Sequence, residues 1–354
     1  MLSKKLPLIK VSGSHYDMGY QCGHQCSEKI RRLTNYILRK INERSPTTLS
    51  DAIFRTKPFI SYVEEYTPNL AEEMKGMADG AAVSLEEAYL PHVGFMFVMN
   101  LGCTTLAISA DKMSESGPIM GKNKDWDFDL EDLGTMVHFT PHEGPVTLMY
   151  TWAGTFATDG INSEGLGVFS NGLWCEGSPR EGLPMSFIYR HLLEQSTVDD
   201  AIGVIRKIKR SQSFNFLLAH VSSEIKNLET TIDDDRVLEA EEGYLVHTNH
   251  YLSPDFLKFE KILEYLPDSP IRHKTLDELI RNEKGKIKME RIKAFLADHM
   301  NYPKSICRHQ APDNPKDPYK NLKTLVSMIS DLDKRIMYAA IGNPCQNQYH
   351  LYQI

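Results

Sequence analysis

The pentapeptide Leu101-Gly102-Cys103-Thr104-Thr105 separates two parts of the chain that differ in their pattern of apolar residues. Before it, apolar residues recur every three to four positions from Met18 to Ile41, which is typical of a long amphipathic helix. After it come short apolar or alternating runs separated by Gly, Pro, Asn and Asp, which is typical of antiparallel strands. The sequence therefore predicts a block of helices up to about residue 100, followed by strands.

Further along the chain, helices are predicted at about 184–211 and 254–300, and two strands follow near the end. Between them lies the segment 301–321, whose four prolines predict a long ordered loop. Blocks of strands alternate with blocks of helices without a βαβ rhythm, so an α+β layered fold is favoured over a doubly wound parallel sheet. The length of 354 residues allows about two domains or one large one. Because the sequence contains no internal repeat and no flexible linker, we expect a single domain over 1–354.

The composition is that of an ordinary globular protein, with 41% hydrophobic and 25% charged residues and a net charge of −7. Because no overall basic field exists to attract polyanions, neither nucleic acid nor a membrane surface is an expected partner. No apolar run approaches the roughly 18 residues of a membrane-spanning helix, and the first residues lack the pattern of a signal peptide. We therefore expect a soluble, cytoplasmic protein whose six cysteines are thiols.

The local motifs predict neither a metal site nor a cofactor site. Cys22, His24 and Cys26 are close in sequence, but a zinc site needs a second pair of ligands, and both thiols fall on the apolar face of the first helix. The run DWDFD at 125–129 resembles the start of a calcium-binding loop, yet Leu130 stands where that loop requires glycine. We therefore expect no metal and no cofactor.

Cys103 follows a glycine and precedes an apparent strand, a position that allows two interpretations. It is either a buried thiol at a turn or a nucleophile released by cleavage of the chain. If its thiol attacks the carbonyl of Gly102, the resulting ester hydrolyses and Cys103 becomes a chain terminus with a free α-amine. That amine has an unperturbed pKa of about 7.7–8.0 and can act as a base near neutral pH. Gly102 suits this step because a side chain would crowd the approaching thiol.

Several other segments join this pentapeptide, and together they resemble one family of enzymes. They are GSHYDMGYQCGHQCSEKI (13–30), EEMKGMADGAAVSLEEAY (72–89), GKNKDWD (121–127), GINSEGLGVFSNGL (160–173), VHTNHY (246–251) and SICRH (305–309). The chain resembles the acyl-coenzyme A:isopenicillin N acyltransferase family of autoprocessed cysteine enzymes, which belong to the N-terminal-nucleophile (Ntn) hydrolases. The resemblance implies an α+β fold, specifically a four-layer αββα sandwich, and implies that Cys103 is the nucleophile.

The resemblance also implies roles for four other residues. Asp125 would accept a hydrogen bond from the α-amine of Cys103, and Asn249 would offer its amide to the developing oxyanion. Arg308 would support the nucleophile or the substrate. Asn171 lies where related enzymes use a backbone N–H for the oxyanion hole. Structural interpretations remain open for the first three: a turn aspartate, a strand-end asparagine and a loop arginine with a surface partner.

The resemblance implies autocleavage into an α chain, 1–102, and a β chain, 103–354, that stay associated. Cys103 would then accept an acyl group from a small amide or thioester and pass it to water or to an amine. We therefore expect an amidohydrolase or N-acyltransferase that acts on small N-acyl compounds through an acyl-cysteine thioester.

Two alternatives remain at this point: an acyl-coenzyme A-dependent penicillin-type acyltransferase, and an unprocessed, non-enzymatic binding scaffold. Lys122 and Lys124 are candidates for contacts with the phosphates of a coenzyme, although no phosphate-binding motif accompanies them. Tyr150, Trp152 and Phe156 are candidates for the lining of an acyl pocket, but aromatic residues at strand spacing also fit a plain core.

Overall fold

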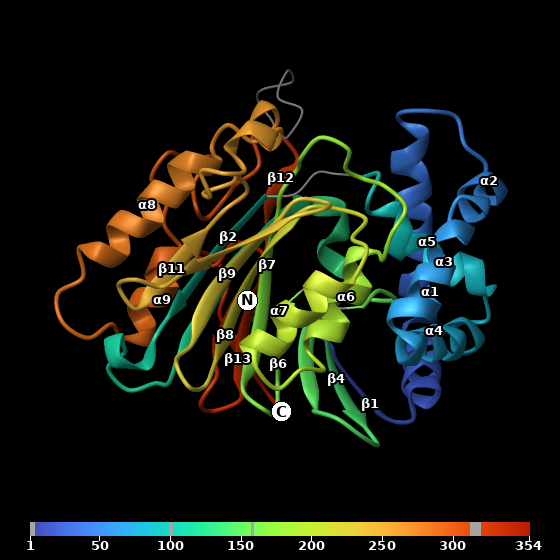
Figure 1. Ribbon diagram of the computed structural model, residues 1–354, viewed down its shortest axis with the longest axis horizontal. Helices are drawn as coiled ribbons and strands as arrows, with labels where there is room; N and C mark the ends of the chain where they lie inside the picture. The colour runs from blue at the N-terminus through green and yellow to red at the C-terminus, as the bar shows by residue number, and fades with distance from the viewer. Residues whose placement is uncertain (1–3, 99–101, 157–158, 312–319) are drawn as a thin grey trace.

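Two β-sheets lie face to face and are enclosed by helices on both outer sides, which makes four layers (Figure 1). The structure is a computed structural model that describes residues 4–98, 102–156, 159–311 and 320–354. The four-layer αββα arrangement expected for an Ntn hydrolase is thereby confirmed, and so is the α+β class.

The larger sheet has eight strands in the order β1-β4-β5-β6-β7-β8-β9-β10. Its strands are β1 (Leu8–Gly13), β4 (Gly134–Pro141), β5 (Thr147–Trp152), β6 (Asp159–Asn162), β7 (Leu166–Gly172), β8 (Phe214–His220), β9 (Ile225–Thr230) and β10 (Asp235–Glu239). β1 pairs in parallel with β4, whereas the other neighbours in this sheet are antiparallel. The edge strand β1 therefore ties the N-terminal segment to a sheet whose other strands come much later in the chain.

The smaller sheet has six antiparallel strands in the order β11-β2-β3-β12-β13-β14. Its strands are β2 (Gly102–Ile108), β3 (Ile119–Asp127), β11 (Tyr244–His247), β12 (Leu322–Asp331), β13 (Ile336–Ile341) and β14 (His350–Gln353). The register of β2 against β3 places Gly102 opposite Asp125 and Cys103 opposite Lys124. Because every residue of both strands is buried, the predicted cleavage site lies at a protected end of a central strand pair.

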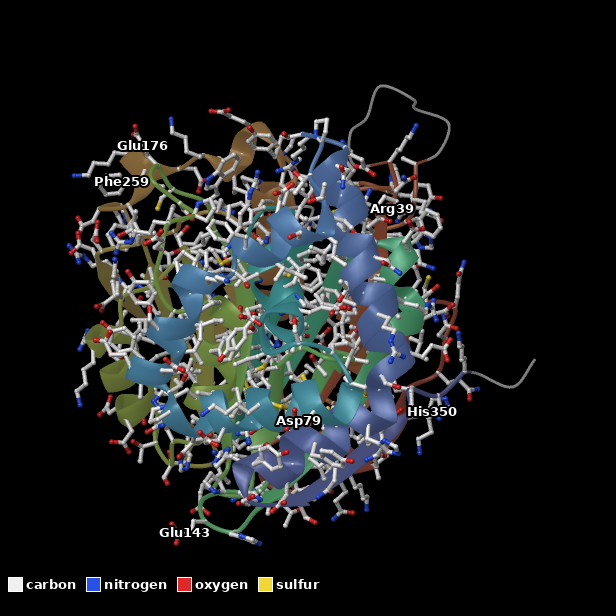
Figure 2. All side chains as sticks on the ribbon, turned by 90° about the vertical axis from the view of Figure 1, so that its right-hand side faces the viewer. Arg39, Asp79, Glu143, Glu176, Phe259 and His350 are labelled. Atoms are coloured by element: carbon white, nitrogen blue, oxygen red, sulfur yellow. The ribbon has the colours of Figure 1, made fainter. Side chains whose placement is uncertain are left out.

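The helices fall into groups that cover different faces of the sheets. The α-helices are α1 (His15–Asn42), α2 (Leu49–Phe54), α3 (Lys57–Tyr66), α4 (Pro68–Ala81), α5 (Leu85–Gly94), α6 (Met185–Leu192), α7 (Val198–Lys207), α8 (Ser269–Arg281) and α9 (Met289–Leu296). Short 3₁₀ helices are η1 (Ala110–Lys112), η2 (Phe128–Leu133), η3 (Leu257–Phe259) and η4 (Ile262–Glu264). α1–α5 cover one outer side and α8 and α9 the other (Figure 1). Figure 2 looks onto the layer of α1–α5, with Arg39 on α1 and Asp79 on α4.

Apolar cores lie between the layers, and two of them involve the larger sheet. One lies between the sheets and includes Met120 from the smaller sheet and Phe169 from the larger one. The other lies between the larger sheet and its helices, where Met18 and Cys22 of α1 pack with Met74 of α4. Burial of each such side chain contributes about 1.5–3 kcal/mol, so both faces of the larger sheet are fixed by packing.

The principal elements agree with the sequence-based prediction. The helix predicted from Met18 to Ile41 is α1, and its first turn is closed by a capping box between Ser14 and Asp17. Strand β1 was not predicted, because a six-residue strand is recognisable chiefly through its partner. Residues 312–319 of the predicted proline-rich loop lie outside the described residues. Among the helices that the structure describes, none is both long enough and apolar enough to cross a bilayer.

Candidate active site

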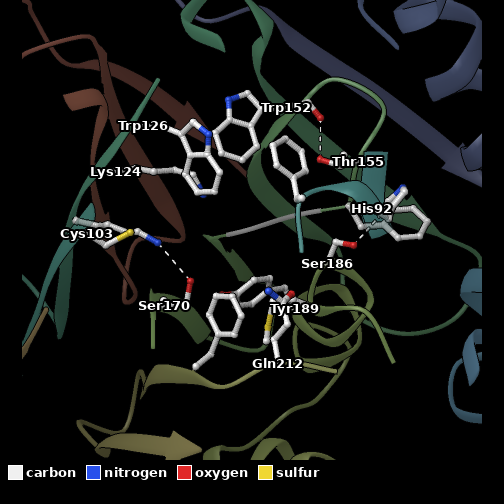
Figure 3. Close-up of a pocket in the computed structure, with 16 residues that line it drawn as sticks. His92, Cys103, Lys124, Trp126, Trp152, Thr155, Ser170, Ser186, Tyr189 and Gln212 are labelled. Carbon is white, nitrogen blue, oxygen red and sulfur yellow. Dashed lines mark hydrogen bonds between the residues drawn. The ribbon is translucent and has the colours of Figure 1, made fainter. Parts of the chain in front are cut away.

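Cys103 lies near the start of β2 and lines a pocket that encloses about 640 Å³ of empty space, part of it open to solvent (Figure 3). Six aromatic side chains form most of its apolar wall: Phe95, Trp126, Trp152, Phe156, Tyr189 and Phe214. Polar side chains share the lining, among them Lys122, Lys124, Ser170, Ser186 and Gln212. The pocket therefore offers a thiol and cations at the edge of a largely aromatic cavity.

Gly102 faces Asp125 across the β2–β3 pair. A Cβ atom built on Gly102 would lie 3.2 Å from Oδ2 and 3.3 Å from Cβ of Asp125, which is tighter than ordinary van der Waals contact. The missing side chain thus lets the Asp125 carboxylate approach the peptide bond that precedes Cys103. Strand β2 runs through both residues, so the structure describes the chain before any cleavage.

The backbone of Cys103 is held on both sides by side chains from distant segments. Its N–H donates to Oδ1 of Asn249 at 2.8 Å, and its carbonyl accepts from the Arg272 guanidinium at 2.7 Å. Arg272 also donates to the Thr104 hydroxyl at 2.8 Å and to Oδ1 of Asn249 at 2.9 Å. A peptide unit fixed in this way has little freedom to move relative to the pocket.

A buried network of two carboxylates and two arginines backs this peptide. Nε of Arg308 lies 3.4 Å from Oδ2 of Asp125, and Thr324 donates to Oδ1 of Asp125 at 2.7 Å. Arg308 also donates to Asp268, which accepts from Nε of Arg272 at 2.7 Å. Burial raises the pKa of Asp125, while the charges of Arg308 and Arg272 oppose that rise.

Two buried lysines give the pocket its positive charge. Nζ of Lys122 lies 2.5 Å from the Asp159 carboxylate and 3.3 Å from the Ser170 hydroxyl. Nζ of Lys124 lies 4.5 Å from the centre of the Trp152 ring and 3.9 Å from Asp159. Burial raises the pKa of the Cys103 thiol, but both lysines act to lower it by favouring the thiolate.

With this geometry in view, comparison with known proteins identifies the family. Residues 112–346, more than half of the chain, match the family described as acyl-coenzyme A:6-aminopenicillanic acid acyl-transferase. The chain belongs to this family. The matched region contains Asp125, Asn171, Asn249 and Arg308, whereas Cys103 precedes it. The resemblance stated from the sequence is therefore confirmed at the level of the family.

A curated relative and several solved structures extend the comparison. An uncharacterized protein of Archaeoglobus fulgidus is 20% identical over 358 residues, and the match covers 84% of this chain and 58% of that relative. The chain thus spans little more than half the length of the relative. A conjugated bile acid hydrolase mutant from Clostridium perfringens has 15% identity and a TM-score of 0.47 over 71% of this chain and 97% of its own. A penicillin V acylase from Agrobacterium tumefaciens has 13% identity and a TM-score of 0.49, and the match covers 68% of this chain and 82% of that protein.

The side chains to which the family resemblance assigned roles do not all have the expected partners. Asp125, Asn249 and Arg308 gather around the Gly102–Cys103 peptide. In the uncleaved chain, however, the N–H of Cys103 donates to Asn249 rather than to Asp125. The amide nitrogen of Asn249 donates to the carbonyl of Gly172 at 3.1 Å, so it is already engaged.

Asn171 takes no direct part in the pocket wall. Its Oδ1 accepts from the Thr105 hydroxyl at 2.8 Å and from the Asn215 amide at 3.1 Å. Of the three aromatic candidates, Trp152 and Phe156 line the pocket, whereas Tyr150 packs in the core between the two sheets.

Sequence reasoning missed Arg272 and Asp268, although both belong to the network beside Cys103. Their spacing of four residues at the start of a helix is typical of an ordinary surface ion pair. Both are nevertheless buried, Arg272 to 1% exposure, and that burial depends on packing against β2. The only sequence signal for their burial would have been apolar residues around these two charged residues at the start of the helix.

Proposed function

We propose that this member of the acyltransferase family is a self-processing cysteine amidohydrolase or N-acyltransferase that acts on small N-acyl compounds. One observation carries the proposal: Cys103 lines an aromatic pocket, while the peptide bond before it is fixed by Asn249 and Arg272 and faces Asp125. A buried thiol used only for packing would not need two lysines, two arginines and the carboxylates of Asp125 and Asp268 around it, because burying charge is costly.

Self-processing would begin with attack of the Cys103 sulfur on the carbonyl carbon of Gly102. The carbon–nitrogen bond breaks, the thiol proton passes to the departing nitrogen, and a thioester between Gly102 and Cys103 forms. Water then hydrolyses this thioester, which leaves a carboxylate on Gly102 and restores the thiol. Cys103 now carries a free α-amine, and we expect the carboxylate of Asp125, which lies opposite Gly102, to accept a hydrogen bond from that amine.

During turnover the Cys103 thiolate would attack the carbonyl carbon of a bound amide or thioester. The α-amine takes up the thiol proton and delivers it to the departing group, and the acyl group remains on sulfur as a thioester. Water as the acceptor gives a carboxylic acid, whereas an amine gives a new amide. Lys122 and Lys124 support this step because their charges favour the thiolate.

The aromatic lining of the pocket favours a substrate whose acyl group is apolar and lies next to the sulfur of Cys103. Trp126 and Trp152 present ring surfaces in this region (Figure 3). Phe156 also lines the pocket. Apolar pockets with few polar groups are typical of small-molecule sites. A dedicated acyl-coenzyme A-dependent penicillin-type acyltransferase is the second candidate, which the family description favours.

The decisive experiment is intact mass spectrometry of the purified protein beside a Cys103→Ala variant. We expect the wild-type chain to give two fragments, with a new N-terminus at Cys103, and the variant to remain intact. Cys175→Ala is the matched control, because it also removes one buried thiol but lies outside the pocket. An intact and catalytically active wild-type chain would refute self-processing, and an intact, inactive one would favour the scaffold alternative.

A second measurement separates the two outcomes of turnover. Acyl release from a phenylacetyl amide is followed with and without an added amine acceptor. If the share of acyl product found as the new amide grows as the acceptor concentration rises, the result supports a transferase. Exclusive formation of free acid at high acceptor concentration supports a hydrolase and rules out the transferase interpretation.

A further inference from the structure

Two histidines and two cysteines from the C-terminal part of the chain converge near the surface. His299 follows α9, Cys307 and His309 lie in the next loop, and Cys345 lies in the connection between β13 and β14. One donor atom from each lies within 4.8 Å of the other three. We refer to these four residues as the C-terminal Cys/His cluster.

The spacing of these donor atoms is close to that of a tetrahedral metal site. The two sulfurs are 3.6 Å apart, and Nε2 of His309 lies 3.7 Å from the sulfur of Cys307 and 3.5 Å from that of Cys345. Nε2 of His299 lies 3.1 Å from Nε2 of His309. Zinc bonds of ~2.3 Å to sulfur and ~2.05 Å to nitrogen imply edges of about 3.8 Å for S–S, 3.6 Å for S–N and 3.3 Å for N–N.

We propose that the C-terminal Cys/His cluster binds one Zn²⁺ ion as a structural site. Two thiolates and two neutral imidazoles are a ligand set that suits zinc, and their negative charges balance the ion. All four positions of the tetrahedron are filled by the protein, so no position is left for a substrate. This inference concerns a different part of the molecule from the Cys103 pocket and does not depend on the proposed reaction.

The surroundings of Cys307 fit a metal-bound thiolate. The side-chain amide of Asn343 donates to its sulfur at 3.4 Å. Hydrogen bonds of this kind commonly orient and stabilise thiolate ligands. His299 and Cys345 are exposed, so an ion can reach the site without unfolding of the loop.

A disulfide between Cys307 and Cys345 explains less of the same geometry. It would join the two sulfurs but would give no reason for two imidazole nitrogens to converge on them. A zinc ion accounts for all four side chains together. The ion would also connect the loop after α9 to the β13–β14 connection. Its ligands Cys307 and His309 flank Arg308, whose carbonyl accepts a hydrogen bond from the Asn343 side chain at 2.6 Å.

The test is elemental analysis of the full chain purified without a polyhistidine tag and dialysed against a mild chelator. We expect about one zinc per chain in the wild-type protein and a loss of at least about tenfold in Cys345→Ser and His299→Ala. Both substitutions are at exposed positions, so they disturb packing little. Cys175→Ala and His142→Ala are matched controls that remove one thiol or one imidazole elsewhere, and they should keep the zinc.

Two further measurements cover the case in which a variant fails to fold. X-ray absorption of the wild-type protein should show two sulfur scatterers at about 2.3 Å and two nitrogen scatterers at about 2.0–2.1 Å around zinc. Strong chelation should lower the melting temperature and make two more thiols reactive. A metal-free wild-type chain that does not take up added zinc overturns the proposal. So does a mass deficit that shows a Cys307–Cys345 disulfide, or stoichiometric binding of copper or iron in place of zinc.

Discussion

At the scale of single residues, the site combines a strict steric demand with an electrostatic cost. Gly102 is opposite Asp125, and an added Cβ would meet that carboxylate at 3.2 Å. A side chain would therefore push β2 away from β3 at the bond that processing is proposed to break. Lys124 carries the electrostatic cost, because it is buried in the pocket beside Cys103 and lies 3.9 Å from its ion-pair partner, Asp159, which is closer to Lys122.

The buried charge of Lys124 predicts a pH-dependent gain in stability when it is removed. Burial lowers the pKa of Lys124 from 10.5 to about 8, and the charge of Lys122 acts in the same direction. Below pH 8 the folded protein bears the full cost, about 3 kcal/mol, and the cost disappears as pH rises toward the unfolded pKa. Lys124→Met should therefore raise the free energy of unfolding at pH 7 by up to about 3 kcal/mol.

Chemical denaturation between pH 7 and pH 10.5 measures this difference. The advantage of Lys124→Met should shrink steadily above pH 8, because the wild-type lysine then loses its proton while the unfolded chain retains it. Lys274→Met is the control, since Lys274 is largely exposed on α8 and its removal should change stability by only a few tenths of a kcal/mol. A constant gain at all pH values would contradict the explanation by burial.

At the scale of elements, close packing of α1 against α4 depends on four glycines. Gly19 and Gly23 of α1 lie against α4, and Gly76 and Gly80 of α4 lie against α1. A Cβ on Gly19 would lie 1.9 Å from the carbonyl oxygen of Glu73, and one on Gly76 would lie 2.0 Å from that of Tyr16. The two helices therefore touch through their backbones, which no larger residue allows.

Gly76→Ala should separate the two helices and weaken the layer that they form. Because the obstructing atoms belong to the backbone and cannot rotate away, we expect a loss of about 1–3 kcal/mol in the free energy of unfolding. Gly203→Ala on α7 is the matched control, because nothing lies within 4 Å of its added Cβ. That variant should gain about 0.5–1 kcal/mol from the helix preference of alanine. Equal effects of the two substitutions in denaturant titrations would argue against the close helix contact.

At the scale of the whole molecule, the proposed cleavage divides the layers between two fragments. The first fragment would keep α1–α5 and β1, and the second would begin inside the smaller sheet at Cys103. β1 pairs with β4 along six residues, and Val11 shares an apolar core with Val137 and Phe139. The interface between fragments is thus a strand pair together with a continuous hydrophobic core.

This arrangement predicts that the fragments stay together after processing. On a size-exclusion column in native buffer, the processed protein should elute at the same volume as the intact Cys103→Ala variant. Both fragments should separate only in denaturant, because the core between them is buried in the same way as the interior of one domain. Elution of two smaller species in native buffer would show that the fragments are not held by this interface.

Much of the fold could be predicted from the chain alone because its patterns are local. The apolar period of α1 and the cap at Ser14 are contained within one segment, and the structure confirms the helix. β1 escaped prediction because its partner, β4, lies more than 120 residues away. Of the side chains with implied roles, Asp125, Asn249 and Arg308 lie together in the structure, and their catalytic roles stay predictions.

The sequence by itself determined the layered α+β class and the family, because periodicity and motifs are properties of neighbouring residues, and it singled out Cys103 as the residue proposed to be the nucleophile. The tertiary structure alone decided that Arg272 holds the Cys103 carbonyl and that the amide of Asn249 is turned toward Gly172. It also brought together the four members of the C-terminal Cys/His cluster, which no local metal motif predicts. These contacts arise from strand register and loop packing between residues that are far apart in the sequence. The local spacing of residues therefore could not predict them.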